Sequence, residues 1–404
     1  MARVGFLPNF STLNGRCPRK LARVRLAVYT DYVYREVDGE VFAERAFALF
    51  LGRLSGAVDR LVVVGREAPE PDSARYAVGA RVELVSLPYY RRLSDPWAVL
   101  RSTLLSLARF WRALRDVDCV WLLGPHPVAI VFAGLAAVRR KRIVLGVRQD
   151  MPAYMESRHP GRRLLRLAGS ALDLAWRALA RVFPVVVVGP GIAARYGKAR
   201  SVLQIAVSLI DADDVVPPAV ALQRSYDGEI RVISVGRLEA EKNPLLLADV
   251  LARLSENGSR WRLVVCGEGP LQAALEDRLE ELGLTKRAEL VGYVPFGPRL
   301  LSLYRESHAM LHVSWTEGLP QVIVEAFAAG IPVVATDVGG VAEAFGDTVR
   351  LIPAGDADAA AGALEEIVAD PTLREALVRG GHDQAAARTA GIEVERVAEF
   401  LRRA

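Results

Sequence analysis

Short runs of β-branched and other apolar residues alternate with amphipathic stretches along the whole chain. The runs are apolar on both faces, and crossovers of about a dozen or more residues separate them, which is typical of buried parallel strands joined by helices. In the first half the expected strands are residues 23–29, 60–64, 81–87, 117–123, 142–147 and 185–188. In the second half they are residues 230–235, 262–266, 288–291, 309–313, 332–335 and 350–352. The pattern predicts an α/β fold with two doubly wound, Rossmann-like domains in tandem.

Two breaks in this pattern set the expected domain boundaries. Residues 1–20 combine prolines with scattered charges, so we expect a loosely held N-terminal arm. Residues 211–228 contain paired prolines and an acidic cluster, which suits an interdomain linker. We therefore expect a first domain over residues 21–210, a second over residues 229–390 and a C-terminal helix over residues 391–404.

A length of 404 residues exceeds one ordinary core and suits two domains. The three cysteines, Cys17, Cys119 and Cys266, are too few for a disulfide scaffold and too far apart for a CxxC metal or redox motif. This cysteine usage indicates a reducing, cytoplasmic compartment.

An uncharged run over residues 119–138 has nearly the length of a membrane span. The sequence GPHP at residues 124–127 breaks the run, so we expect a buried strand, a tight loop and a short core helix instead. We expect no transmembrane helix, and residues 1–20 lack the apolar stretch of a secretory signal.

Charge divides sharply between the two halves. Residues 1–200 carry 33 Lys and Arg against 16 Asp and Glu, a net charge of +17, whereas residues 201–404 carry 19 against 31, or −12; together they give +5. A basic half suits nucleic acid, anionic lipid or an acidic acceptor. We expect no nucleic-acid partner, because no stacked aromatic platform or known binding motif is present.

Residues 158–181 place arginines between Leu, Ala and Trp at helical spacing. Such a helix can rest peripherally on an anionic membrane, on its inner face, with Trp176 at the interface. An ordinary helix with its solvated side outward explains the same pattern.

The segment over residues 315–336, WTEGLPQVIVEAFAAGIPVVAT, carries the most information. We expect a turn at Gly318 after a strand, and a helix over residues 320–329 that begins at Pro320 and ends before Gly330.

Two features of this helix point to a ligand. The amides of Gly318, Leu319 and Gln321 would face the cleft between the domains, where unpaired N–H groups and the helix dipole favour an anion. Glu325 lies inside an apolar helix, where a carboxylate needs hydrogen-bond donors such as a ribose diol. Alternatively, Glu325 lies on a wet face or pairs with an arginine.

A second segment, residues 230–244, reads IRVISVGRLEAEKNP. Arg237 and Lys242 follow a buried strand and can neutralise a diphosphate, and Asn243-Pro244 suits the cap and first residue of the next helix. The alternative is a solvated loop that pairs with its own acids, Glu239 and Glu241.

Together, GRLxxEKNP and, about 75 residues later, EGLPxxxxEAFAAGxPVVAT resemble the nucleotide-sugar half of glycosyltransferase family 4. Glu317 and Glu325 match the E-x7-E signature of that family. The close resemblance covers residues 229–385. It implies the GT-B fold, in which two Rossmann-like doubly wound domains face each other and a C-terminal helix crosses back to the first domain.

The resemblance also implies roles for individual residues. Arg237 and Lys242 would bind the donor diphosphate and stabilise its charge as it leaves. Glu325 would hold the ribose hydroxyls, and Glu317 would lie near the donor sugar. The other expected donor contacts are Gly236, Gly267, Gly269, Val294, Gly318, Leu319 and Pro320.

The first half resembles the family only in general pattern. His126 follows a strand where the family often has a histidine that contacts the donor sugar, although a core histidine is the alternative. Gly39 would belong to a flexible acceptor-side loop or a plain surface turn, and Gln149 and Asp150 would lie near the acceptor. AVSLI at residues 206–210 departs from the family's Asn-Gly-Val-Asp turn, which puts acceptor-side details in doubt.

We expect no metal and no cofactor, because Arg237 and Lys242 can stabilise the leaving group. The DAD sequences at residues 211–213 and 356–358 mimic metal motifs but lie in acidic loops. His308 and His312 flank a strand rather than a metal-binding helix, and we expect both to be structural.

The resemblance implies a hexosyltransferase-like enzyme of EC class 2.4. It would move a hexose from a UDP- or GDP-linked donor to a hydroxyl of a glycan, lipid-linked or small-molecule acceptor, with retention of configuration. Alternatives are a nucleotide-sugar-binding protein without transferase activity and a scaffold docked on anionic lipid. A dinucleotide-dependent oxidoreductase is disfavoured, because no GxGxxG follows a predicted first strand.

Overall fold

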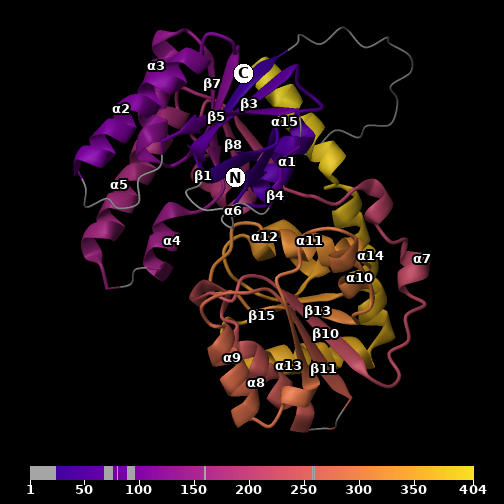
Figure 1. The fold of residues 1–404 in the computed structure, drawn as a ribbon. Helices are drawn as coiled ribbons and strands as arrows, with labels where there is room; N and C mark the ends of the chain where they lie inside the picture. The colour runs from indigo at the N-terminus through magenta and orange to yellow at the C-terminus, as the bar shows by residue number, and fades with distance from the viewer. Residues whose placement is uncertain are drawn as a thin grey trace, which may run out of the picture.

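The computed structural model describes residues 24–67, 76–79, 81–88, 96–158, 161–256, 258 and 260–404. The N-terminal arm predicted over residues 1–20 lies outside the described residues. Figure 1 shows two α/β units, each built on its own sheet. We refer to the sheet of β1–β9 with its helices as the first unit and to the sheet of β10–β15 with its helices as the second unit.

The described strands of the first unit form a nine-stranded sheet in which β5, β3, β1, β6, β7, β8 and β9 lie side by side in parallel. The pair β2 and β4 extends from β1 in antiparallel fashion. The bounds are β1 (Arg25–Val37), β2 (Glu40–Ala43), β3 (Arg60–Glu67), β4 (Tyr76–Ala77), β5 (Val82–Leu87), β6 (Cys119–Gly124), β7 (Arg142–Val147), β8 (Val185–Val188) and β9 (Val202–Ile205).

The second unit has a six-stranded, all-parallel sheet in the order β12-β11-β10-β13-β14-β15. Counted within the unit, this is the 3-2-1-4-5-6 order of a Rossmann-like sheet. The bounds are β10 (Ile230–Val235), β11 (Trp261–Cys266), β12 (Ala288–Gly292), β13 (Ala309–His312), β14 (Val333–Thr336) and β15 (Arg350–Ile352). The predicted α/β class with two doubly wound sheets is confirmed.

Helices cover both faces of each sheet, so each sheet separates two hydrophobic clusters. In the first unit they are α1 (Phe47–Leu54), α2 (Pro96–Ala113), α3 (Pro127–Val138), α4 (Met151–Arg158), α5 (Arg163–Ala180) and α6 (Pro190–Arg195). The later helices are α7 (Pro218–Ala221), α8 (Leu245–Glu256), α9 (Gln272–Glu281), α10 (Pro298–Arg305), α11 (Gln321–Ala328), α12 (Val341–Phe345), α13 (Ala357–Ala369), α14 (Pro371–Ala386) and α15 (Ala390–Arg403).

The uncharged run over residues 119–138 is strand β6, a short turn and helix α3, as predicted. Pro127 is the first residue of helix α3. A backbone N–H at that position would have no partner within the helix, so a proline costs no hydrogen bond there. Across the described ranges, no helix is both long and apolar enough to cross a bilayer.

Helix α15 leaves the second unit and packs on the first, as the resemblance implied. Its side chains Val394, Val397 and Leu401 are buried in the same cluster as strand β1 and helix α1. The Arg142 guanidinium donates to the Arg402 carbonyl at 2.7 Å. Figure 1 shows α15 alongside the first unit, away from the rest of the C-terminal helices.

The first aspartate of each DAD sequence has a partner within the protein. Asp211 forms an ion pair with Arg53 of helix α1. Asp356 accepts a hydrogen bond from the Ala359 amide at 2.8 Å and caps helix α13.

Candidate active site

Both sheets reverse their strand order at the first strand, and these reversal points carry the predicted chemistry. Strand β1 lies between β3 and β6, and β10 lies between β11 and β13. Loops that leave such neighbouring strands in opposite directions open a crevice at the carboxyl ends. His126 follows β6, Arg237 follows β10, and Glu317 follows β13.

Two adjoining cavities of about 600 and 620 Å³ occupy the cleft between the units. Both are lined by residues of each unit and share Arg45, Gly236, Arg237 and Gln321. The predicted residues of the first cavity are His126, Gln149, Lys242, Glu317, Leu319 and Pro320. Those of the second are Gly267, Gly269, Val294 and Glu325. Each volume lies within the usual range for small-molecule sites.

Lys242 and Glu317 form an ion pair that joins the two motif segments. His312 Nε2 lies 2.9 Å from the same carboxylate oxygen, and the Ser314 hydroxyl donates to it at 2.7 Å. Burial by itself raises the pKa of Glu317, but the charge of Lys242 and the hydrogen bond with His312 outweigh it and hold the pKa well below its usual range. Glu317 is therefore an anion that fixes Lys242 in the wall of the cleft.

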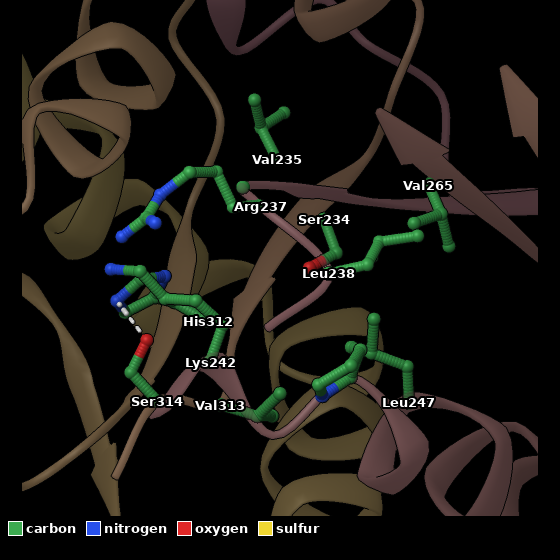
Figure 2. A pocket seen from close by; sticks show the side chains of 12 residues that line it. Ser234, Val235, Arg237, Leu238, Lys242, Leu247, Val265, His312, Val313 and Ser314 are labelled. Carbon is green, nitrogen blue, oxygen red and sulfur yellow. Dashed lines mark hydrogen bonds between the residues drawn. The ribbon is translucent and has the colours of Figure 1, made fainter. Parts of the chain in front are cut away.

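Arg237 pairs with the two acids of its own loop, as the alternative interpretation of this segment predicted. Its guanidinium lies 2.5 Å from Glu239 and 3.1 Å from Glu241, while it still lines both cavities. Lys242 departs from that interpretation, because its partner is Glu317. Arg237, Lys242 and His312 also line a small pocket of about 20 Å³. Figure 2 shows their nitrogen-bearing ends gathered on one side of it.

The predicted helix cap at Asn243-Pro244 is wrong by one residue. Asn243 ends a short turn with φ of 50°, in the left-handed region, and helix α8 begins at Leu245. An amide side chain tolerates this conformation better than most residues do. The turn places Lys242 toward Glu317.

Glu325 is buried in helix α11 and accepts a hydrogen bond from the Tyr304 hydroxyl at 2.9 Å. The sequence offered two alternatives, a solvent-exposed helix face and an arginine partner. Both are wrong, because Glu325 is buried and its partner is a tyrosine. Burial raises the pKa of Glu325 to about 7, although the Tyr304 hydrogen bond opposes the shift. Glu325 is one of the residues that line the second cavity.

Gly267 and Gly269 let the loops after β10 and β11 pack against each other. A Cβ on Gly267 would lie 1.8 Å from the Gly236 carbonyl oxygen, and one on Gly269 would lie 2.5 Å from that of Leu238. Only glycine fits both positions without a backbone shift. Val294, which is buried, closes the same cavity from the loop after β12.

The turn before helix α11 is also a contact between the units. A Cβ on Gly318 would lie 3.3 Å from the Arg148 carbonyl oxygen, and one on Gly189 would lie 3.1 Å from the Leu319 Cβ. Pro320 is the N-cap rather than the first helical residue predicted from the sequence.

In the first unit, His126 is the N-cap residue of α3, and its Nδ1 lies 3.0 Å from the Tyr29 hydroxyl. Burial lowers the pKa of His126, although the charge of Asp31 opposes the shift. Gln149 lines the first cavity. Asp150 pairs with Arg195 and accepts from the Ala153 amide at 3.2 Å, and it is not among the described residues that line the two cavities.

Gly39 lies in a tight turn between two strands, the surface turn of the alternative interpretation. Strand β1 continues well past the predicted end at residue 29, and Asp38 and Gly39, with φ of 53° and 80°, make the two-residue turn to β2. Such a turn needs positive φ at both positions. Gly39 lies at this hairpin tip and not among the described residues that line the cleft.

Three residues of the site escaped the sequence analysis. The sequence predicts a structural role for both His308 and His312. His308 has such a role, because its Nδ1 accepts a hydrogen bond from the Arg231 amide at 3.0 Å. The signal for His312 was its place at the carboxyl end of a strand beside the reversal point. Arg148 lines the cleft with its guanidinium 4.4 Å from the Phe47 ring, and Tyr304 holds Glu325.

Comparison with known proteins connects this site to a family. The profile of glycosyl transferases group 1 matches residues 221–384. The Vi polysaccharide biosynthesis protein VipC/TviE of Salmonella typhi is 33% identical over 124 residues, which are 30% of this chain and 21% of that protein. The 2-deoxystreptamine glucosyltransferase of Streptomyces kanamyceticus is 27% identical over 313 residues, 72% of this chain and 78% of that protein.

The fold extends the likeness over nearly the whole chain. The crystal structure of HepE from Anabaena in complex with UDP superposes with a TM-score of 0.68 at 18% identity, covering 94% of this chain and 100% of that one. This likeness includes the first unit, where the family profile has no match. Residues 221–384 are therefore similar to the glycosyl transferases group 1 family, which is the glycosyltransferase family 4 of the resemblance above, and the chain has a GT-B fold.

Proposed function

We propose that the protein transfers a hexose from a nucleoside-diphosphate sugar to an acceptor hydroxyl, with retention of anomeric configuration. The observation that carries the proposal is the convergence of Arg237, Lys242 and the buried Glu325 on one cleft at the reversal points of two sheets. UDP in the structure of HepE and the glucosyltransferase activity named for the Streptomyces protein support a UDP-linked hexose.

The geometry supports the following sequence of steps. The nucleoside occupies the second cavity, with its ribose hydroxyls at Glu325 and its diphosphate at Arg237 and Lys242. These cations stabilise the charge that develops on the departing diphosphate, as preorganised donors do in a closed site. The acceptor hydroxyl attacks the sugar from the same face, and its proton passes to a leaving phosphate oxygen. Glu317 holds Lys242 in place, and His126 lies across the cleft.

Turnover with a panel of donors and acceptors tests the proposal. The protein is incubated with UDP- and GDP-hexoses and simple glycan or lipid-linked acceptors, while nucleoside diphosphate release is followed and the product linkage is read by proton NMR. We expect release with one donor, an axial-to-axial or equatorial-to-equatorial product, and its loss in Arg237→Ala. Inverted product refutes retention, and donor binding without release supports a binding protein instead.

A further inference from the structure

Helix α5 buries Trp176, the residue that the sequence analysis expected at a membrane interface. Trp176 is fully buried, and Gly124 of strand β6 lies so close that a Cβ there would be 2.6 Å from its ring. Gly169, Asp173 and Ala180 are buried on the same face. Trp176 therefore fixes α5 to the first unit and cannot enter a membrane.

The opposite face of α5 carries an apolar stripe that is open to solvent. Leu164, Leu167 and Leu174 are 82%, 66% and 62% exposed, and Ala171 and Ala178 are exposed between and beyond them. Their spacing of three, four, three and four residues aligns them along one side of the helix. Contiguous exposed apolar patches mark interaction sites, whereas single exposed apolar residues are ordinary.

Arginines border this stripe. Residues 161–181 contain five arginines and one aspartate, a net charge of +4, and the aspartate is the buried Asp173. Arg163 and Arg181 are exposed, and no carboxylate of the described chain forms an ion pair with either. Arg166 and Arg177 each have one acidic partner.

We infer that this face of α5, the stripe Leu164, Leu167 and Leu174 with Arg163 and Arg181, docks on an anionic lipid surface. The leucines would enter the boundary between headgroups and acyl chains, while the arginines would contact lipid phosphates. A second copy of the chain is the poorer partner, because two identical faces would bring like charges together.

The position of α5 relates this docking to the cleft. Helix α4 packs on it, since a Cβ on Gly169 would lie 2.8 Å from the Met155 side chain. The same α4 places Met151 and Tyr154 in the wall of the first cavity. Figure 1 shows α4 and α5 on the side of the first unit away from α15. Resting on the proposed function, the docked surface would bring a lipid-linked acceptor to the first cavity.

Vesicle flotation of the full chain tests the docking. We expect flotation with vesicles of phosphatidylcholine plus phosphatidylglycerol, weak flotation with phosphatidylcholine alone, and weakening in high salt. The triple variant Leu164→Ser/Leu167→Ser/Leu174→Ser should lower the lipid-bound fraction at least about tenfold. The control Val220→Ser/Ile392→Ser removes residues that are 57% and 41% exposed on α7 and α15, and should bind as the unmodified protein does.

Thermal unfolding with UDP accompanies each flotation. An unchanged UDP shift shows that the triple variant is folded and keeps its donor site, so a failure of docking is distinguishable from a failure of the proposed function. Equal flotation of the triple variant would overturn the inference. So would light scattering that shows a dimer broken by the same three substitutions.

Discussion

The protonation of Glu325 is set by its surroundings more than by its own chemistry. Its carboxyl is buried among apolar residues with one tyrosine hydroxyl as partner, and burial raises its pKa to about 7. The folded protein therefore holds a proton there that the unfolded chain releases near its ordinary pKa of 4.5. The contribution of this proton to the free energy of unfolding is fully present below the ordinary pKa, and it is lost as the pH rises from that value to about 7.

Glu325→Gln should remove that loss. Between about pH 5 and pH 8, we expect the stability of the unmodified protein to fall relative to the variant by on the order of 3 kcal/mol. Urea unfolding at a series of pH values measures the difference. Parallel stability curves for the two proteins would show that Glu325 is already ionised at low pH.

The affinity for UDP should depend on the same proton. Ribose hydroxyls donate to the ionised carboxylate, so UDP should bind more tightly as the pH rises through about 7. Calorimetric titration should show this trend in the unmodified protein and a flat profile in Glu325→Gln. A rising profile in the variant would assign the titration to another group.

Lys242 combines a structural and a chemical role, and two variants separate them. Lys242→Met leaves the buried Glu317 anion without its cation, which should lower stability by about 3–5 kcal/mol. Adding Glu317→Gln should restore most of the stability, but kcat/KM should stay about 100- to 1,000-fold low, because the leaving group has lost a cation. Recovered turnover in the double variant would argue against a direct role for Lys242.

Sequence reasoning located the two glutamates but not their partners. The turn and helix over residues 315–336 indicated Glu317 and Glu325 from local signals alone. Tyr304 is 21 positions from Glu325, on another helix, and the angle between α10 and α11 decides that contact. Contacts of this kind depend on packing that no local pattern encodes.

At the scale of elements, the loops after β10 and β11 support the donor cavity by direct backbone contact. The Gly267 amide also donates to the Gly292 carbonyl at 2.8 Å, which ties in the loop after β12. Because backbone meets backbone here, a side chain cannot be accommodated by a rotamer change.

Gly269→Ala should therefore disturb binding and not only stability. The added methyl lies 2.5 Å from the Leu238 carbonyl oxygen, so the loops must separate, and we expect about 1–3 kcal/mol of destabilisation and weaker UDP binding. Gly362→Ala on helix α13, where nothing lies within 4 Å, is the matched control. Unchanged UDP affinity in Gly269→Ala would place the nucleotide elsewhere.

Most of the parallel strands were predictable because they are short apolar runs, and central ones such as β6, β7 and β8 are buried on both faces. The strands that escaped prediction, β2, β4 and β9, are short and lie toward the edges of the sheet. Strand β1 runs on to Val37 through TDYVYREV, which contains charged residues, and its pairing with β2 decides that extension.

At the scale of the whole molecule, the chain passes between the units twice at one place. The Ala390 amide donates to the Ile210 carbonyl at 2.8 Å, and the Ala206 amide donates to the buried Glu393 at 3.2 Å. The start of α15 is thus joined to the segment that leaves the first unit, so both crossings move together. The relative placement of the units rests on such contacts, which are remote in sequence and escape local patterns.

Removing residues 391–404 should weaken donor turnover, since α15 ties the ends of the two units together. Leu401→Ala is the milder test, and we expect it to lower stability by about 2–5 kcal/mol, because the side chain is fully buried against the first unit. Steady-state kinetics of both proteins check the coupling. Unchanged kinetics in the truncated protein would show that α15 has no part in closure.

The nucleotide site in the cleft is tested most directly by thermal unfolding of the protein against UDP, GDP, ADP, CMP and NAD. We expect one nucleoside diphosphate to raise the unfolding midpoint, with about 2.7 kcal/mol of stabilisation at a hundredfold excess over its Kd. Glu325→Ala and Arg237→Ala should abolish the shift. A shift with NAD alone, or the same nucleotide shift in both variants, would contradict the assignment of this cleft.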